Sequence, residues 1–376
     1  MFKKKKIYLV LSVILAVALL SACGGNSSPD PAPAPTPAPS NNQSTTPPPA
    51  DETVYELNVN LTGGEPGQQN YLKLFRELEE ESGGRLQCTV YFAGSLLAIP
   101  DIPKGLQSGV AEISSMATNN YTSIMPLNSR ILQFPFMGLK DPGVAVEILT
   151  QLQAEFPEMQ KEFDDLGIIN LGNFAFPPYN LHFSDEKIDV RVPADVKGLK
   201  IMTNKIEFQE ILNSAGAAPV QMSPSDVYTS LEKNVIDGYA NSYGFAPKFG
   251  LTDVSVNHLE FGEYGAWLDF SNTGINAAFF NSLPEDLQQI IVNKFATKGY
   301  IPYQDELDMT ESFKATGEAR GDKFVTLTDE ELAQWSELGV AAHQNAIDEI
   351  NAARGDDAAS RIYARALELI AERFGN

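Results

Sequence analysis

Residues 54–61 (VYELNVNL), 69–81 (QNYLKLFRELEEE) and 86–92 (LQCTVYF) decide the fold of this chain. The first segment alternates apolar and polar residues at the period of a strand. The second repeats apolar residues at helical spacing and is followed by a glycine pair, 83–84, which is typical of a helix end. The third again has the character of a strand. Strand, helix and strand in this order predict a parallel sheet covered by helices.

The same alternation continues along the chain. Further predicted elements are a short helix at 102–108, a strand at 110–116, and, in a second unit that begins near Tyr179, a strand at 199–201, a helix at 205–215, a strand at 218–220, a helix from Ser223 and a strand with a turn at 235–238. The region 283–373 is mostly helical in pattern. About 325 residues follow the N-terminal region, enough for two domains. We therefore expect an α/β protein of two domains.

The N-terminus has the features of a secretory signal. Four lysines, Lys3 to Lys6, precede an apolar run at 7–20 that is shorter than the roughly 20 residues a bilayer needs. The run closes on Leu20-Ser21-Ala22-Cys23, which looks like a bacterial lipobox. We expect residues 1–22 to be a lipoprotein signal peptide and Cys23 to be lipidated. The alternative is an ordinary signal peptide with a chance cysteine at the cleavage site.

Residues 23–51 comprise that cysteine and a proline-rich segment after it. Such a composition cannot bury a core and favours polyproline II. We expect it to link Cys23 to the folded part, so that acyl chains anchor the protein on the extracytoplasmic face of the cell membrane. Cys88, the second of two cysteines, lies in a predicted strand and is expected to be a small buried apolar residue.

The charge and the missing motifs exclude several classes of function. The formal net charge is −22, which repels nucleic acid, so we expect no nucleic-acid partner. His182, His258 and His343 lie far apart and outside any metal-binding spacing. The sequence has no nucleophile elbow, Walker A loop or dinucleotide fingerprint. We expect no metal, no cofactor and no enzymatic activity.

Seven segments in order resemble the solute-binding proteins of TRAP (tripartite ATP-independent periplasmic) transporters, the DctP-like family. They are 82–86 (SGGRL), 105–113 (GLQSGVAEI), 134–136 (FPF), 196–201 (VKGLKI), 216–223 (GAAPVQMS), 226–238 (DVYTSLEKNVIDG) and 282–288 (SLPEDLQ). The resemblance covers roughly residues 54–370, essentially all of the chain after the linker.

The resemblance implies a two-domain, periplasmic-binding-protein-like fold of type II with a hinge and a central ligand cleft. We expect lobe I to contain residues 52–177 and 265–300, and lobe II to contain residues 178–264 and 301–376 with the C-terminal helices. It also implies that the loaded protein hands a small molecule to a permease with a small and a large membrane subunit.

Polar residues near the end of one predicted strand are candidates for the ligand site. Asp237 and Gly238 follow apolar residues, and the crevice outside the carboxyl ends of strands is where open α/β sheets bind ligands. Asn241 follows three residues later and offers both a donor and an acceptor. Each also has a plain structural explanation, as a turn residue or a structural carboxylate.

Position 202 departs from the family pattern. Similar proteins carry an arginine there that pairs with the ligand carboxylate, whereas this chain has Met202, which cannot donate a hydrogen bond or carry charge. Either another cation takes that role or the ligand is neutral, zwitterionic or cationic, with Met202 in an apolar wall. The candidate cations are Arg130, Lys205, Arg191 and Lys200.

Aromatic residues cluster near the expected crossing between domains and suggest an apolar pocket wall. The predicted ligand-binding residues are Met202, Asn241, Asp237, Tyr179, Asn180, Phe174, Tyr239, Trp267 and Arg130. The ligand is expected to be an organic acid, or an aromatic or non-carboxylate compound. The alternatives to transport are a ligand-binding sensor lipoprotein without a permease, a secreted enzyme and an ABC-type binding protein.

Overall fold

The computed structural model describes residues 53–65, 68–262, 264–298 and 301–375, which belong to one compact unit, Asp51–Asn376. The predicted signal peptide, Cys23 and the proline-rich linker lie outside the described residues. Within the described ranges, no helix combines the length and apolar character that crossing a bilayer requires.

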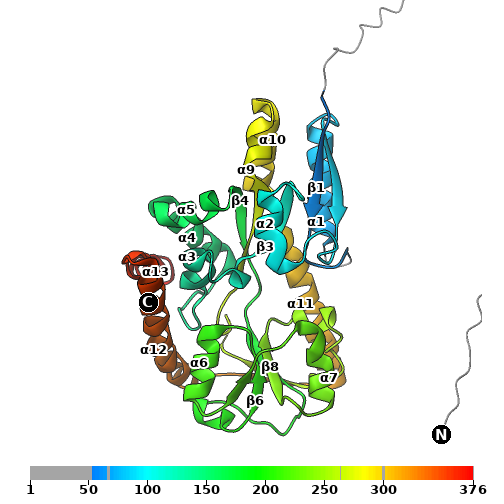
Figure 1. The fold of residues 1–376 in the computed structure, drawn as a ribbon. Helices are drawn as coiled ribbons and strands as arrows, with labels where there is room; N and C mark the ends of the chain where they lie inside the picture. Colours follow the sequence, from blue (N-terminus) through cyan, green and yellow to red (C-terminus); the bar gives the residue numbers. More distant parts are fainter. Residues whose placement is uncertain (1–52, 66–67, 263, 299–300, 376) are drawn as a thin grey trace, which may run out of the picture. The chain divides into compact units, whose positions relative to one another are not determined.

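The first sheet confirms the strand–helix–strand prediction at the start of the chain. Strands β1 (Tyr55–Asn60) and β2 (Leu86–Tyr91) are parallel, and α1 (Gln69–Glu81) connects them (Figure 1). The third strand, β3 (Ile113–Ala117), is also parallel to β1, but it begins later than predicted. Gly109 has a φ of 73°, and the turn that it makes takes up the start of the predicted strand.

The full first sheet is mixed rather than parallel. Its strand order is β2-β1-β3-β10-β4, with β4 at Ile168–Ala175 and β10 at Phe270–Asn276. The late strand β10 lies antiparallel to both of its neighbours. The expectation of a parallel sheet was therefore wrong for the half of the sheet that receives the returning chain. Short apolar runs do not reveal the direction of their neighbours.

The second sheet has six strands in the order β11-β9-β5-β8-β6-β7. Their bounds are β5 (Asn180–Phe183), β6 (Lys200–Met202), β7 (Ala218–Val220), β8 (Gly238–Asn241), β9 (Asn257–Glu260) and β11 (Lys323–Thr326). This sheet is also mixed, because β5 is antiparallel to β8 and β9. Helices α6 (Ile206–Ser214) and α7 (Val227–Glu232) flank β6 and β8 (Figure 1).

One strand of this sheet begins later in the sequence than predicted. The sequence predicts a strand at 235–236 that turns at Asp237, but β8 begins only at Gly238. Asn234, two residues after the end of α7, adopts a φ of 54°, and residues 235–237 then lead the chain into the sheet. Asp237 consequently precedes its strand and lies at the opposite end of it from the carboxyl edge.

Two of the chain segments that connect the sheets pair with each other. Residues 176–179 lead from β4 to β5, and residues 261–269 return from β9 to β10. Phe176 N donates to Asp269 O at 2.8 Å, and Tyr179 N donates to Trp267 O at 3.0 Å. This pairing fixes the residues that lie between the two sheets.

The remaining helices cover the sheets and link them. They are α2 (Ile102–Gln107), α3 (Pro126–Arg130), α4 (Pro142–Glu155), α5 (Pro157–Asp165), α8 (Phe245–Lys248), α9 (Ala277–Ser282), α10 (Glu285–Lys298), α11 (Ile301–Arg320), α12 (Asp329–Arg354) and α13 (Ala358–Phe374). A capping box starts α12, in which Thr328 Oγ1 accepts from Glu331 N and Glu331 Oε2 accepts from Thr328 N. Gly355, with a φ of 76°, ends it.

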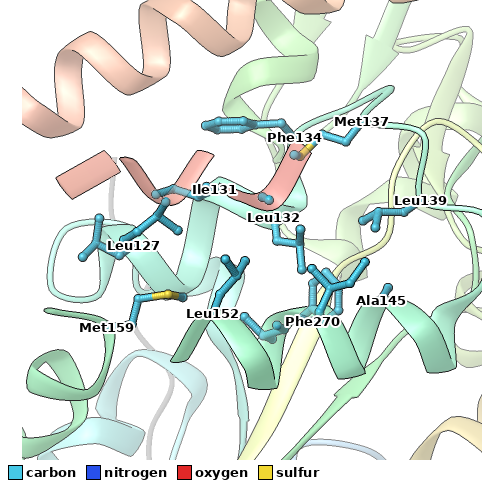
Figure 2. Packing of buried hydrophobic residues seen from close by; sticks show 14 of the residues in the cluster. Leu127, Ile131, Leu132, Phe134, Met137, Leu139, Ala145, Leu152, Met159 and Phe270 are labelled. Carbon is cyan, nitrogen blue, oxygen red and sulfur yellow. The ribbon is translucent and has the colours of Figure 1, made fainter. Parts of the chain in front are cut away.

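The largest apolar cluster joins the C-terminal helices to the first sheet. Leu127, Ile131 and Phe134 meet Leu152 of α4 and Phe270 of β10 (Figure 2). The same cluster contains Ile347 and Ile350 of α12 and six buried side chains of α13, whereas Trp335 near the start of α12 packs in the cluster of the second sheet. The predicted lobe boundaries stay a prediction. The packing differs from them in one respect, since α13, which was assigned to lobe II, packs on α4 beside the first sheet.

Candidate functional site

A cavity of about 390 Å³ lies between elements of the two sheets. Its lining includes Ser115 and Ala117 of β3 from the first sheet, Ala240 and Asn241 of β8 from the second, and Trp267 from the returning segment. A volume of this size is within the range of small-molecule sites. The carboxyl ends of β3 and β8 both reach it, which is the position that open α/β sheets use for ligands.

Six of the nine predicted ligand-binding residues line this cavity. They are Arg130, Phe174, Tyr179, Met202, Asn241 and Trp267. Their assignment to ligand binding stays a prediction, but the structure brings them to one place from α3, β4, β6, β8 and the two connecting segments.

The other three lie outside the lining. Asp237 Oδ2 accepts from Lys200 N at 2.7 Å, before β8 begins. Asn180 Oδ1 accepts from Phe261 N at 3.1 Å, which ties β5 to the returning segment. Tyr239 is fully buried, and its hydroxyl pairs with Ser255 Oγ at 3.0 Å. Side chains two residues apart on a strand point to the same face of the sheet, so Tyr239 and Asn241 share a face of β8. Tyr239 is fully buried there, whereas Asn241 is half-buried and reaches the cavity.

Aromatic rings form much of the apolar wall. Tyr179 and Trp267 stack with ring centroids 4.8 Å apart, and Phe174 meets Phe176 edge to face at 5.6 Å. Burial, with the nearby Asp269 carboxylate, raises the pKa of Tyr179 well above its ordinary value, so the phenol stays neutral. These rings offer broad contact area to a flat or apolar ligand.

The cavity lining contains three basic side chains, each near a carboxylate. Arg130 Nε donates to Glu207 Oε1 at 2.7 Å, and Lys248 pairs with Glu306. Lys205 Nζ lies 3.6 Å from Asp269 Oδ1. Burial opposes the charge of Arg130, but its two carboxylate partners, Glu207 and Glu349, outweigh burial and raise its pKa.

Two of the four candidate cations do not reach the cavity. Arg191 pairs with Glu331 at 3.1 Å, and Lys200 is exposed on β6; neither belongs to the lining. Met202 is only 2% exposed and packs with Val227 and Tyr239 in an apolar cluster. Position 202 therefore carries no charge into the cavity, and the choice of cation narrows to Arg130 and Lys205.

Asn241 is held by its neighbours in a defined orientation. Its Oδ1 accepts from Ser242 N at 2.9 Å, and its backbone oxygen accepts from His182 Nε2 at 3.0 Å. Because His182 must donate through Nε2, its Nδ1 is the acceptor for His258 Nδ1 at 2.9 Å. Both imidazoles are buried, and burial lowers the pKa of each, so the pair is neutral. The two histidines therefore hold the backbone of Asn241 in place through His182, and within the described ranges they belong to no metal-binding group.

Several lining residues were missed from the sequence. Asp269 accepts from Trp267 Nε1 at 3.1 Å and from Asn119 Nδ2 at 2.8 Å. A lone acid inside the apolar run 265–270 was a usable signal for it. Glu306 lies in the middle of α11, where the sequence has no distinguishing pattern. No group of three or more His, Cys, Asp or Glu suited to a metal ion occurs within the described ranges.

Comparison with known families and proteins shows which proteins this chain is similar to. The model of a family described as bacterial extracellular solute-binding protein, family 7 (DctP), matches residues 59–349. A solute-binding protein of Albidiferax ferrireducens is 28% identical over 153 residues, which is 39% of this chain and 43% of that protein. The chain thus spans less than half the length of this relative.

Two further similarities extend over more of the chain. The C4-dicarboxylate-binding periplasmic protein DctP of Rhodobacter capsulatus is 25% identical over 284 residues, 74% of this chain and 82% of that protein. The crystal structure of a TRAP solute-binding protein from Rhodoferax ferrireducens in complex with copurified benzoate has a TM-score of 0.75 at 21% identity, covering 86% of this chain and 99% of that one. The predicted class, a two-domain α/β binding-protein fold, is confirmed, with both sheets mixed.

Proposed function

Since the chain belongs to the bacterial extracellular solute-binding protein family 7, we propose that it captures a small organic acid outside the cytoplasm and delivers it to a TRAP-type transporter. The family consists of solute-binding proteins rather than enzymes. The observation that carries the proposal is the cavity of about 390 Å³ between the two sheets, with its aromatic wall and its buried cations.

Capture in such a cavity needs no chemical step. A ligand that contacts elements of both sheets stabilises the arrangement in which they close on it, because only that arrangement makes all the contacts. The partners in this proposal are the small and large membrane subunits of the permease. The aromatic residues Tyr179 and Trp267 supply contact area, and Asn241 supplies a polar contact.

The N-terminal region completes the proposal. Lipidation of Cys23 would tether the protein to the extracytoplasmic face of the membrane through the proline-rich segment 24–51. This part of the proposal rests on the Leu20–Cys23 motif in the sequence. Mass spectrometry of the protein recovered from membranes tests it, because Cys23→Ala should release the protein from the membrane fraction and abolish the diacylglyceryl mass.

Uptake by cells tests the transport role. Cells that express both permease subunits should accumulate a radiolabelled ligand only when this protein is also present. Equal uptake without the protein would contradict delivery to a permease and would favour the alternative role of a ligand-binding sensor. Chemical conversion of the bound compound by the purified protein would contradict solute binding altogether.

A further inference from the structure

Lys205 carries an ammonium group in the cavity whose hydrogen-bonding capacity is unfilled. Its side chain is 7% exposed and lines the cavity. Nζ has three donors, yet its partner among the described residues is Asp269, whose Oδ1 lies 3.6 Å away, which is beyond hydrogen-bond distance. A buried ammonium with unfilled donors is costly unless another group accepts from it.

Asp269 is committed to other donors. Its Oδ1 accepts from Trp267 Nε1 at 3.1 Å, and its Oδ2 accepts from Asn119 Nδ2 at 2.8 Å. This carboxylate, together with burial, also raises the pKa of the nearby Tyr179 hydroxyl. Asp269 therefore balances the charge of Lys205 without taking up its hydrogen bonds, and it fixes the aromatic wall beside the ammonium.

The other two basic residues of the lining are engaged. Arg130 donates to Glu207 at 2.7 Å and to Glu349 at 3.1 Å. Lys248 pairs with Glu306 and lies 6.0 Å from the centre of the Phe176 ring. Lys205 is consequently the cation of the described lining that is left to receive an anion from a ligand. One such cation matches one carboxylate, not two.

The backbone around Lys205 supports the same assignment. Lys205 is the N-cap of the nine-residue helix α6, and no side chain caps the amides of its first turn. Residues 203–207 line the cavity. The positive end of the α6 dipole is therefore at the cavity and favours an anion beside the Lys205 ammonium.

We propose that Lys205 anchors the ligand, and that the ligand is a monocarboxylate with a flat or apolar body, its carboxylate on Lys205 Nζ and its body against Trp267 and Tyr179. This assignment rests on the proposed function and names the ligand class of the same cavity. It explains how the chain dispenses with a cation at position 202: Lys205, three residues later at the start of α6, supplies the charge that Met202 lacks.

Calorimetric titration of the full chain with benzoate, benzamide and succinate tests the proposal. Benzoate should bind more tightly than benzamide, which has the same shape without the charge, and more tightly than the dicarboxylate succinate. Lys205→Met should weaken benzoate binding about 10- to 100-fold, the usual effect of losing a hydrogen bond to a charged group. Lys205→Arg keeps the charge and should stay within about tenfold of the wild type.

Lys200→Met is the matched control, since Lys200 is exposed on β6 and outside the lining, and it should leave the affinity unchanged. Thermal unfolding of each variant without ligand shows whether it folds. Unchanged benzoate affinity in Lys205→Met would overturn the anchor while leaving solute capture intact. A preference for benzamide or succinate over benzoate, or no binding of benzoate at all, would overturn the ligand class. The uptake experiment judges the transport role separately.

Discussion

Arg130 Nε donates a hydrogen bond of 2.7 Å to Glu207 Oε1, and both side chains are buried. Arg130 ends α3, which packs in the cluster of the first sheet, and Glu207 lies in the first turn of α6, which flanks the second. The ion pair therefore connects the two sides of the cavity. Sequence reasoning proposed Arg130 as a ligand contact, whereas its hydrogen bonds in the structure go to protein carboxylates.

Removing one partner of this pair should cost more stability than removing the charge of both. Arg130→Met leaves Glu207 buried without its cation, and we expect the free energy of unfolding to fall by about 3–5 kcal/mol. The double variant Arg130→Met, Glu207→Gln should lose less. Urea unfolding at pH 7 measures both. A double variant that is less stable than the single one would show that the two groups do not act as a pair.

Asn241 should contribute to ligand affinity through its amide donor. Asn241→Asp retains the oxygen that accepts from Ser242 N but replaces the NH₂ group by a second anionic oxygen. We expect benzoate affinity to fall by at least about tenfold, since a donor is lost and a like charge is gained. Asn213→Asp, on the exposed part of α6, adds the same charge elsewhere and should have little effect in the same titration. Equal affinities for the two variants would remove Asn241 from the site.

Acid should destabilise the protein through its buried histidines. Burial lowers the pKa of His258 to about 4 from an ordinary 6.5, against the opposing attraction of Asp322 at 3.5 Å. Between these two pH values the unfolded chain binds a proton that the folded chain does not. The stabilisation is complete above pH ~6.5 and is lost as the pH falls towards 4, so this residue alone should lower the free energy of unfolding by about 2 kcal/mol from pH 7 to pH 5.

Comparison with His258→Gln isolates this contribution. The variant should show a shallower decrease in the free energy of unfolding between pH 7 and pH 5, whatever its stability at pH 7. Urea unfolding at the two pH values gives both slopes. If the wild type and the variant lose the same free energy, His258 is not neutral in the folded protein.

Gly265 should tolerate substitution much less well than Gly250, although both have left-handed φ values, 65° and 69°. A Cβ on Gly265 would lie 2.6 Å from Tyr179 O and 2.7 Å from Pro178 Cβ, whereas a Cβ on Gly250 has open space. Gly250→Ala should cost about 1–2 kcal/mol from backbone strain alone. Gly265→Ala should cost about 1–3 kcal/mol more from overlap between the connecting segments. Similar values in thermal unfolding would contradict the close approach.

Local pattern was sufficient for much of the fold. The helix at 69–81 and the strand at 218–220 have the predicted bounds, since apolar spacing and glycine ends define them. Local pattern did not predict the direction of β10 or the start of β8. The direction of β10 depends on where the chain returns from a distant part of the sequence. The start of β8 depends on the left-handed conformation of Asn234, which no local composition requires.

The candidate site shows the same division. Met202 was predicted from the family pattern, and Asn241 from its place three residues after the Asp237-Gly238 turn; both line the cavity. Asp237 was placed at the wrong end of its strand, because the strand starts one residue after it. The pairing of Arg130 with Glu207 and of Lys248 with Glu306 joins residues 77 and 58 positions apart, so charge matching in the cavity could not be read along the chain.

Native mass spectrometry of the full chain after incubation with benzoate, followed by analysis of the compound released on denaturation, tests the central claim most directly. The account predicts one benzoate adduct per chain, which an excess of a competing carboxylic acid of different mass displaces. It also predicts that the released benzoate has an unchanged mass. Absence of the adduct, two or more adducts of equal affinity, or release of a converted product would contradict it.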